Sequence, residues 1–289
     1  MGLAALAVAL LVYAWLEAGW LRTRVLELHL PDLAPALDGL RIIHLSDFHL
    51  GAPLSRGRVA TERAVAWAVD RRPDLICVTG DLVSHPRGEP RLRALLERLD
   101  RPYVVLGNHD VAITRDPFSR AAELEDLREA ILLRDEVATV SVRGVAVQIA
   151  GVDPVSYRTR SADPVRHSDP AARLRILLCH YPGVCRQLPP GAFHLILAGH
   201  MHAGQIAVPL PGRTLALAHP RALELTGVYK TPAGVLHVSP GTGTSLLPLR
   251  FFARPEVTEL VLHDAGFEGD RLHLGPHVGE RVQDVPVEE

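Results

Sequence analysis

Cysteine is scarce in this 289-residue chain, and charge of neither sign prevails. Cys77, Cys179 and Cys185 are too few and too scattered for a disulfide framework, so we expect buried thiols. The 31 basic and 33 acidic residues leave a formal net charge of −2, which excludes a polybasic nucleic-acid binder. We therefore expect no nucleic-acid partner. Because 47% of the residues are hydrophobic, a disordered acidic chain is excluded as well.

The N-terminus carries a long hydrophobic stretch. Residues 2–16 have no charge, and residues 18–21 extend the stretch past Glu17. A spanning helix needs about 20 mostly apolar residues, so the segment is only just long enough. We interpret residues 1–24 as an uncleaved membrane anchor, because no basic residue precedes the run and no small-x-small site follows it. A buried or surface-lying helix is the alternative.

Two arginines indicate on which side of the membrane the catalytic domain lies. Arg22 and Arg24 directly follow the hydrophobic stretch. Positive charges that flank a span mark its cytoplasmic end, so we expect the catalytic domain on the cytoplasmic face. Export to the cell envelope is the alternative.

The first half of the remaining chain alternates short apolar runs with helical patterns. Strands are predicted at 41–46, 75–79 and 103–106, and helices at 59–71, 91–99 and 121–132. Strands that alternate with helices indicate parallel βαβ units and a layered α/β fold.

The pattern changes beyond residue 137, where strands follow one another closely. They are predicted at 137–142, 145–150, 174–179, 194–198, 205–208, 235–238 and 257–262, and we assign the last three to a second sheet. With no linker between the halves, we expect one two-sheet catalytic domain over residues 25–262. Residues 263–289 form a polar tail.

Five polar clusters come directly after predicted strands. They are Asp47-Phe48-His49, Gly80-Asp81, Gly107-Asn108-His109-Asp110, His180 and Gly199-His200-Met201-His202. Taken singly, each is explained by a turn or by a buried histidine. Ligands of open α/β sheets bind beyond the carboxyl ends of the strands, so the five clusters together predict one shared site.

The donor atoms of these clusters predict a metal site. The candidate ligands carry oxygen or imidazole donors and no thiolate: Asp47, His49, Asp81, Asn108, His180, His200 and His202. This set has too many imidazoles for calcium or magnesium and suits manganese, iron or zinc. Seven ligands exceed what one ion needs, so we expect two divalent metal ions that share a carboxylate. Such a pair activates a water as hydroxide and holds a phosphoryl oxygen.

In this order, from about residue 40 to residue 262, the motifs resemble those of the calcineurin-like metallophosphoesterase superfamily. Residues 46–51, 204–206 and 239–256 are similar to its YkuE/YaeI-type branch. That branch more often has Gly-His-Thr-His-Gly-Gly-Gln where this chain has Met201 and Ala203. Neither is a ligand position, so the departure concerns the shape of the pocket.

The resemblance implies a four-layer α/β/β/α sandwich of two mixed sheets, and it implies residue roles. Three residues would hold the first metal and three the second, with one bridging residue between them: Asp47, His49 and His202; Asn108, His180 and His200; and Asp81. His109 would contact the phosphate or protonate the leaving oxygen, and Asp110 would orient its imidazole.

We therefore expect a metal-dependent hydrolase of phosphodiesters or pyrophosphates. By analogy with relatives of this branch, its substrate would be lipid-linked, such as UDP-diacylglucosamine, and would be met at the membrane. The alternatives are a phosphodiesterase for soluble nucleotides or cell-wall phosphodiesters, and a non-catalytic, metal-stabilised binding scaffold.

The segment around residue 250 supplies weaker candidates. The guanidinium of Arg250 suits a substrate phosphate, and an ion pair with Glu256 or Glu259 is the alternative. Hydrophobic side chains nearby would serve an acyl chain or simply the core: Leu246, Leu247, Phe251 and Phe252.

Overall fold

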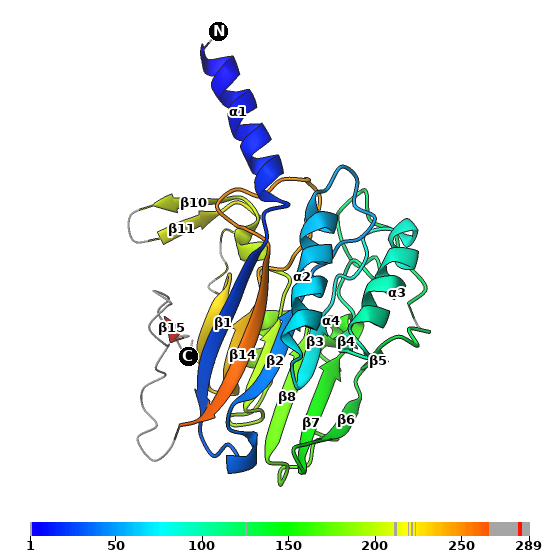
Figure 1. The fold of residues 1–289 in the computed structure, drawn as a ribbon, viewed down its shortest axis with the longest axis vertical. Coiled ribbons are helices and arrows are strands. Elements are labelled where there is room, and N and C mark those ends of the chain that lie inside the picture. Colours follow the sequence, from blue (N-terminus) through cyan, green and yellow to red (C-terminus); the bar gives the residue numbers. More distant parts are fainter. Residues whose placement is uncertain are drawn as a thin grey trace.

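The computed structural model describes residues 2–124, 126–210, 213–218, 220, 222, 224–265 and 283–284. Two large mixed sheets dominate this part of the chain (Figure 1). The first has the strand order β1 (Arg22–Leu30), β14 (Glu256–Asp264), β2 (Leu40–Leu45), β3 (Leu75–Thr79), β4 (Tyr103–Val105) and β5 (Ile131–Leu132). The second has the order β15 (Gln283–Asp284), β12 (Gly227–Thr231), β13 (Gly234–Val238), β9 (Leu195–Ala198), β8 (Leu174–Cys179), β7 (Val145–Val152) and β6 (Val137–Val142). A separate hairpin pairs β10 (Ala207–Leu210) with β11 (Arg213–Ala216).

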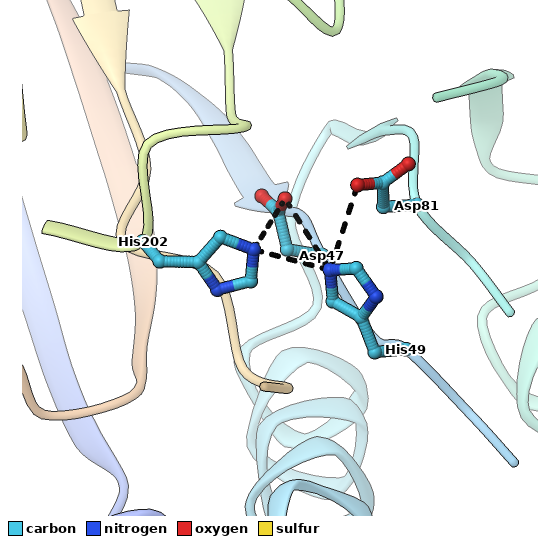
Figure 2. Close-up of side chains that lie close together, drawn as sticks. All are labelled: Asp47, His49, Asp81 and His202. Atoms are coloured by element: carbon cyan, nitrogen blue, oxygen red, sulfur yellow. Dashed lines mark hydrogen bonds and ion pairs between the residues drawn. The ribbon is translucent and has the colours of Figure 1, made fainter. Parts of the chain in front are cut away.

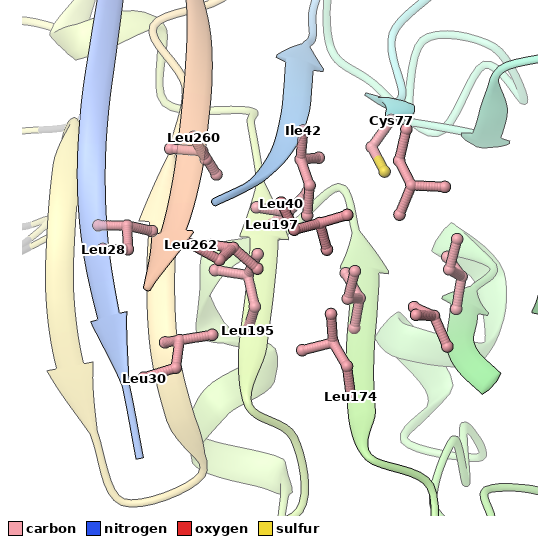
Figure 3. Close-up of a cluster of buried hydrophobic side chains, with 14 of the residues drawn as sticks. Leu28, Leu30, Leu40, Ile42, Cys77, Leu174, Leu195, Leu197, Leu260 and Leu262 are labelled. Carbon is pink, nitrogen blue, oxygen red and sulfur yellow. The ribbon is translucent and has the colours of Figure 1, made fainter. Parts of the chain in front are cut away.

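Strand β2 shows why the two sheets pack face to face. Successive side chains of a strand point to opposite faces of the sheet. Leu40 and Ile42 accordingly lie in a buried cluster between the sheets, together with Leu195 and Leu197 of the second sheet (Figure 3). The two-sheet prediction is confirmed.

The opposite face of β2 packs against helices. Ile43 and Leu45 lie in a second cluster with apolar side chains of two helices, α2 (Gly57–Arg71) and α3 (Glu89–Arg98). These helices agree with the sequence prediction to within two residues at each end.

The outer face of the second sheet has a lighter cover. Tyr157 of α4 (Pro154–Thr159) and Val184 of the 3-10 helix η3 (Pro182–Gln187) pack there against Leu177 and Ile196. The outermost layer on this side therefore consists of short helical turns and loops.

Three sequence predictions of secondary structure are wrong. In the described part of 121–132 the backbone makes short-range turns and then forms β5, although Leu124 and Leu127 are buried as an apolar helix face would be. Strand β14, assigned to the second sheet, lies in the first. It pairs parallel with β1 and antiparallel with β2. The strand predicted at 205–208, which we also assigned to the second sheet, is β10 of the separate hairpin.

Helix α1 (Gly2–Glu17) projects away from the body (Figure 1). Its 16 residues span about 24 Å at about 1.5 Å per residue, against a hydrocarbon thickness of about 30 Å. Of the helices described, none combines the length and the apolar content needed to cross a bilayer. The chain leaves the helix after Glu17, and residues 22–24, which we assigned to the anchor, already belong to β1.

The pairing of these strands places α1 at one particular end of the sandwich. Strand β1 starts next to α1 and runs antiparallel to β2 by way of β14, so the carboxyl end of β2 lies at the α1 end. Strands β3 and β4 run parallel to β2 and end there too.

Candidate metal centre

Every predicted cluster lies just beyond a strand end, as the sequence indicated. Asp47 and His49 follow β2, Asp81 follows β3, and Asn108 follows β4. On the second sheet, His180 follows β8, and His200 and His202 follow β9. The structure brings all of these ligands together in two adjoining groups.

The first group consists of Asp47, His49, Asp81 and His202, all of them buried (Figure 2). One ligand atom from each lies within 4.8 Å of the others. The Nε2 atoms of His49 and His202 are 3.1 Å apart, and His202 Nε2 lies 3.3 Å from Asp47 Oδ1. His49 Nε2 lies 3.5 Å from Asp81 Oδ2. These separations suit donors that surround one small cation.

The second group consists of Asp81, His180 and His200, with Asn108 beside them. His180 Nε2 lies 3.2 Å from Asp81 Oδ2, 3.1 Å from Asn108 Oδ1 and 3.1 Å from His200 Nδ1. Asp81 is the member common to both groups. That is the position a bridging carboxylate must occupy.

Backbone strain is concentrated at this site. Five of the ligands have positive φ: Asp47, His49, Asp81, His200 and His202, with values of 53°, 47°, 51°, 72° and 51°. Left-handed backbone in such residues costs of order 1–3 kcal/mol each and clusters at functional sites. Left-handed backbone makes the chain turn sharply after each strand, so that these side chains point toward one another.

Glycines make room for the carboxylates. A Cβ at Gly107 would collide with Asp81 Oδ1, and one at Gly199 would collide with Asp47 Oδ2. The motifs therefore need these glycines, because a side chain there would fill the space of the ligand.

The hydrogen bonds of His180 show that the donor set fits a cation. Its Nδ1 lies 2.8 Å from the carbonyl oxygen of Thr79, which can only accept, so Nδ1 carries a proton. In neutral His180 the Nε2 lone pair then faces oxygens of Asp81 and Asn108, which also only accept. A metal ion satisfies such a ring of acceptors, and the bond to Thr79 holds the tautomer that ligates it.

Without a metal, a proton takes that place. Burial disfavours the charged form of His180, but the carboxylates of Asp81 and Asp47 raise its pKa to about 9. Burial holds the pKa of His49 and His202 well below the usual value. Those two imidazoles are therefore neutral at pH 7, the form that binds metals.

The pKa values of the two carboxylates in the first group, Asp47 and Asp81, shift in opposite directions. Burial raises the pKa of Asp47 to about 6, with Asp81 adding to the rise. Burial acts in the same sense on Asp81, but His180, His109 and His49 lower its pKa well below the usual value. Asp81 is thus the permanently charged centre of the site.

His109 lies beside the first group, where a substrate contact was predicted. Its ring centroid is 4.6 Å from that of His49, and its Nδ1 has no hydrogen-bond partner among the described residues. Its backbone N–H donates to Asp81 Oδ1 at 2.8 Å. The residue thus orients the bridging carboxylate and keeps a ring nitrogen available.

Asp110 is turned away from the imidazole it was expected to orient. Its carboxylate accepts the backbone N–H groups of Val83 and Gly107 at 2.9 and 2.8 Å, and burial raises its pKa to about 7. The carboxylate nearer the ring belongs to Asp116, whose Oδ2 lies 4.0 Å from His109 Nδ1. Asp116 stands outside the motif, so the sequence offered no signal for it.

Arg250 has no exposed surface, and its guanidinium donates to backbone carbonyls, including those of Gly243 and Ala253. The Nη2 atom of Arg250 lies 3.2 Å from His202 Nδ1. Glu256 pairs instead with Arg22, and Glu259 with Arg41 and Arg71. This geometry gives no support to direct contact between Arg250 and a substrate phosphate.

Three hydroxyls that sequence analysis missed support the ligands. Ser46 Oγ donates to Asp47 Oδ2 at 2.5 Å, and Thr79 Oγ1 donates to Ser46 Oγ at 2.8 Å. Ser84 Oγ lies 2.9 Å from His49 Nδ1. Ser46 and Thr79 directly precede motifs, which was their only signal.

The fold and the site define a metallophosphoesterase. The model of the calcineurin-like phosphoesterase family matches residues 40–204, so this chain belongs to that family and the resemblance is confirmed. The chain is 28% identical to the metallophosphoesterase YkoQ of Bacillus subtilis over 234 residues, which cover 78% of this chain and 85% of YkoQ. It is 24% identical to phosphodiesterase YaeI of Escherichia coli over 229 residues, which cover 77% of this chain and 82% of YaeI. A Bos taurus transmembrane protein with metallophosphoesterase domain is 31% identical over 261 residues, 83% of this chain and 56% of the bovine protein.

Proposed function

We propose that this chain is a phosphodiesterase or pyrophosphatase that works with two divalent metal ions. The observation that carries the proposal is the pair of ligand groups that share Asp81. Asp47, His49 and His202 hold one ion with Asp81, and Asn108, His180 and His200 hold the other. Manganese, iron or zinc suits these nitrogen and oxygen donors. When bound, such a pair lowers the pKa of a shared water and polarises a phosphoryl oxygen.

The residues of the chain supply positioning and proton transfer. The glycine-flanked turns leave the ligand side chains little freedom, so the phosphorus atom meets a preformed site. His109 donates a proton to the leaving oxygen, because its Nδ1 is the unpartnered ring nitrogen at the edge of the first group. Thr114 Oγ1, 3.3 Å from Nε2, holds the other ring nitrogen, and the charge of Asp116, 4.0 Å from Nδ1, keeps the protonated ring turned toward the first group.

Turnover and metal content together test this proposal. The full chain is loaded with manganese, its metal content is measured by elemental analysis, and hydrolysis of bis(p-nitrophenyl) phosphate is followed. We expect two ions per chain and turnover that falls by about 100-fold or more in His109→Ala, the usual contribution of a general acid. Metal binding without wild-type turnover would favour the binding scaffold instead.

We propose a lipid-linked phosphoester as the substrate class, with α1 seated in the membrane interface. The apolar residues of α1 are exposed, Leu3 to 86% and Leu6 to 56%, and Leu54 and Phe252 near its base are exposed to 83% and 58%. A helix that is apolar all round is driven out of water, and a bilayer offers it an apolar environment. Since α1 lies at the carboxyl end of β2, this contact would bring the metal centre close to a bilayer. No observation singles out UDP-diacylglucosamine within that class.

Vesicle flotation and a substrate pair test the membrane proposal. We expect the full chain to float with phosphatidylglycerol vesicles and a Leu3→Asn, Leu6→Asn double variant to stay in solution. The double variant should lose activity on a lipid-linked pyrophosphate in vesicles and keep it on bis(p-nitrophenyl) phosphate. Equal activity of both proteins on both substrates would favour a phosphodiesterase for soluble nucleotides or cell-wall diesters. The cytoplasmic orientation is a separate proposal, which protease protection in intact cells would test.

A further inference from the structure

The last residue of α1 is an acidic side chain in the interior. Glu17, which fell within the predicted anchor segment, is only 1% exposed. Its Oε1 accepts the backbone N–H of Ala253 at 2.7 Å. A carboxylate at this depth needs a cationic partner, because burial of an uncompensated charge is costly.

The buried cation on which the charge of Glu17 acts is Arg250, which contacts both α1 and the first ligand group. Its backbone N–H donates to the carbonyl of Ala14 in α1 at 2.9 Å, and its Nη1 donates to the carbonyl of Ala253 at 2.8 Å. The pair is thus joined through Ala253, whose N–H binds Glu17 and whose carbonyl binds Arg250.

On its other side the guanidinium reaches the first ligand group. Its Nη1 donates to the backbone carbonyl of His202 at 3.5 Å, and its Nη2 donates to the carbonyl of Gly243 at 2.7 Å. Gly243 in turn donates its N–H to the carbonyl of Asp47 at 2.6 Å. Arg250 therefore holds the backbone at Asp47 and at His202, two ligands of the same proposed ion.

The buried guanidinium depends on the acidic groups around it. The acidic groups whose charges act on this guanidinium are Asp47, Glu17 and Glu256. Among these, Asp47 is a ligand whose charge a bound metal takes up, and Glu256 pairs with Arg22. Glu17 supplies compensation from outside the catalytic strands.

We propose that Glu17 is a positioning residue of the metal centre: through Arg250 it holds His202 and the Asp47 turn in place, which makes the base of α1 part of the active site. This inference rests on the proposed metal centre. It implies that α1 stabilises the site for soluble as well as lipid-linked substrates.

The test measures manganese affinity of the metal-free full chain by titration calorimetry. Glu17→Gln removes the charge but keeps an oxygen that accepts the Ala253 N–H, and the exposed Glu97→Gln is the matched control. We expect the dissociation constant of the tighter ion to rise by a factor between about 2 and 30 in Glu17→Gln, the range for residues that act on a site without touching it. It should stay unchanged in Glu97→Gln.

Two backgrounds separate positioning from a general structural role. Glu17→Gln should still weaken binding in Arg250→Lys, which keeps a cation, and should have no further effect in Arg250→Met, which has none. Thermal unfolding shows that each variant is folded, and the Lys background suffices if the Met variant is not. Wild-type affinity in Glu17→Gln would overturn the inference alone. Failure of the wild-type chain to bind manganese would overturn it together with the proposed function.

Discussion

The two ligand groups differ in how firmly the protein holds them. In the first, each ligand outside the bridge has a buried partner: Ser46 for the Asp47 carboxylate, Ser84 for the His49 ring and Arg250 for the backbone carbonyl of His202. In the second, His180 is fixed by the Thr79 carbonyl, but His200 is only half-buried, with its ring 4.8 Å from that of Tyr181. Partners behind a ligand orient it and raise metal affinity. We infer that the first ion binds more tightly and that the second exchanges more readily.

The largest effect should come from the residue that joins the two groups. Asp81→Ala removes the bridging carboxylate and the strongest negative charge of the site. Both ions should be lost, and turnover should fall by about a thousandfold or more. Elemental analysis after gel filtration measures the loss, and two ions still bound per chain would rule out the bridging role.

Substitution of a single ligand in each group tests the inferred order of metal affinity. His202→Gln should weaken the tighter manganese site by more than about 100-fold, since loss of a ligand exceeds the effect of losing its supporting partner. His200→Gln should weaken only the looser site. Calorimetric titration distinguishes the two, and the reverse assignment would contradict the inferred order of affinity.

Two acidic residues near His109 give a smaller contrast. Asp116→Asn should lower kcat by about tenfold, part of what a general acid contributes, and more strongly for alkyl than for p-nitrophenyl leaving groups. Asp110→Asn should instead lower the free energy of unfolding by about 1–3 kcal/mol, because its carboxylate accepts two buried N–H groups. An equal leaving-group dependence in both variants would exclude an orienting role for Asp116.

The smallest effect concerns two buried histidines, His44 and His237, which are linked through Thr79 to the Ser46 hydroxyl that bonds Asp47. His44 Nδ1 lies 2.7 Å from His237 Nδ1, and His44 Nε2 lies 2.9 Å from Thr79 Oγ1, which donates to Ser46. Burial lowers the pKa of His237 to about 3 and that of His44 well below the usual value. Below about pH 6.5 these two histidines therefore bind protons in the unfolded chain but not in the folded chain. The free energy of unfolding consequently falls as the pH falls.

His237→Gln should make the metal-free protein less sensitive to acid between about pH 6.5 and pH 4. Urea unfolding over that range measures the change in slope, with the exposed His167→Gln as control. A slope as steep in His237→Gln as in the wild type would show that this histidine does not titrate on unfolding.

The sequence predicted where the candidate ligands lie, because chemistry and position coincide in them. Asp47, Asp81 and His180 stand one or two residues beyond apolar runs, so local pattern alone places them at strand ends. What local pattern cannot reveal is the pairing of distant segments. Strand β14 joins the first sheet because it pairs with β1, more than 200 residues earlier in the chain.

The same limit applies to residues that act through contacts made in three dimensions. Asp110 lies next to His109 in sequence but binds backbone amides, whereas Asp116 approaches the ring from a loop. Glu17 fell within the predicted anchor, and nothing in the sequence indicated that Ala253 would join it to Arg250. In 121–132 the apolar spacing is helical, but burial of Leu124 and Leu127 is achieved by turns.

Anomalous diffraction from manganese-loaded crystals tests the central claim most directly. The account predicts two anomalous peaks about 3.5–4 Å apart, one among Asp47, His49 and His202 and one among Asn108, His180 and His200, with Asp81 between them. A single peak, or a peak remote from Asp81, would contradict it.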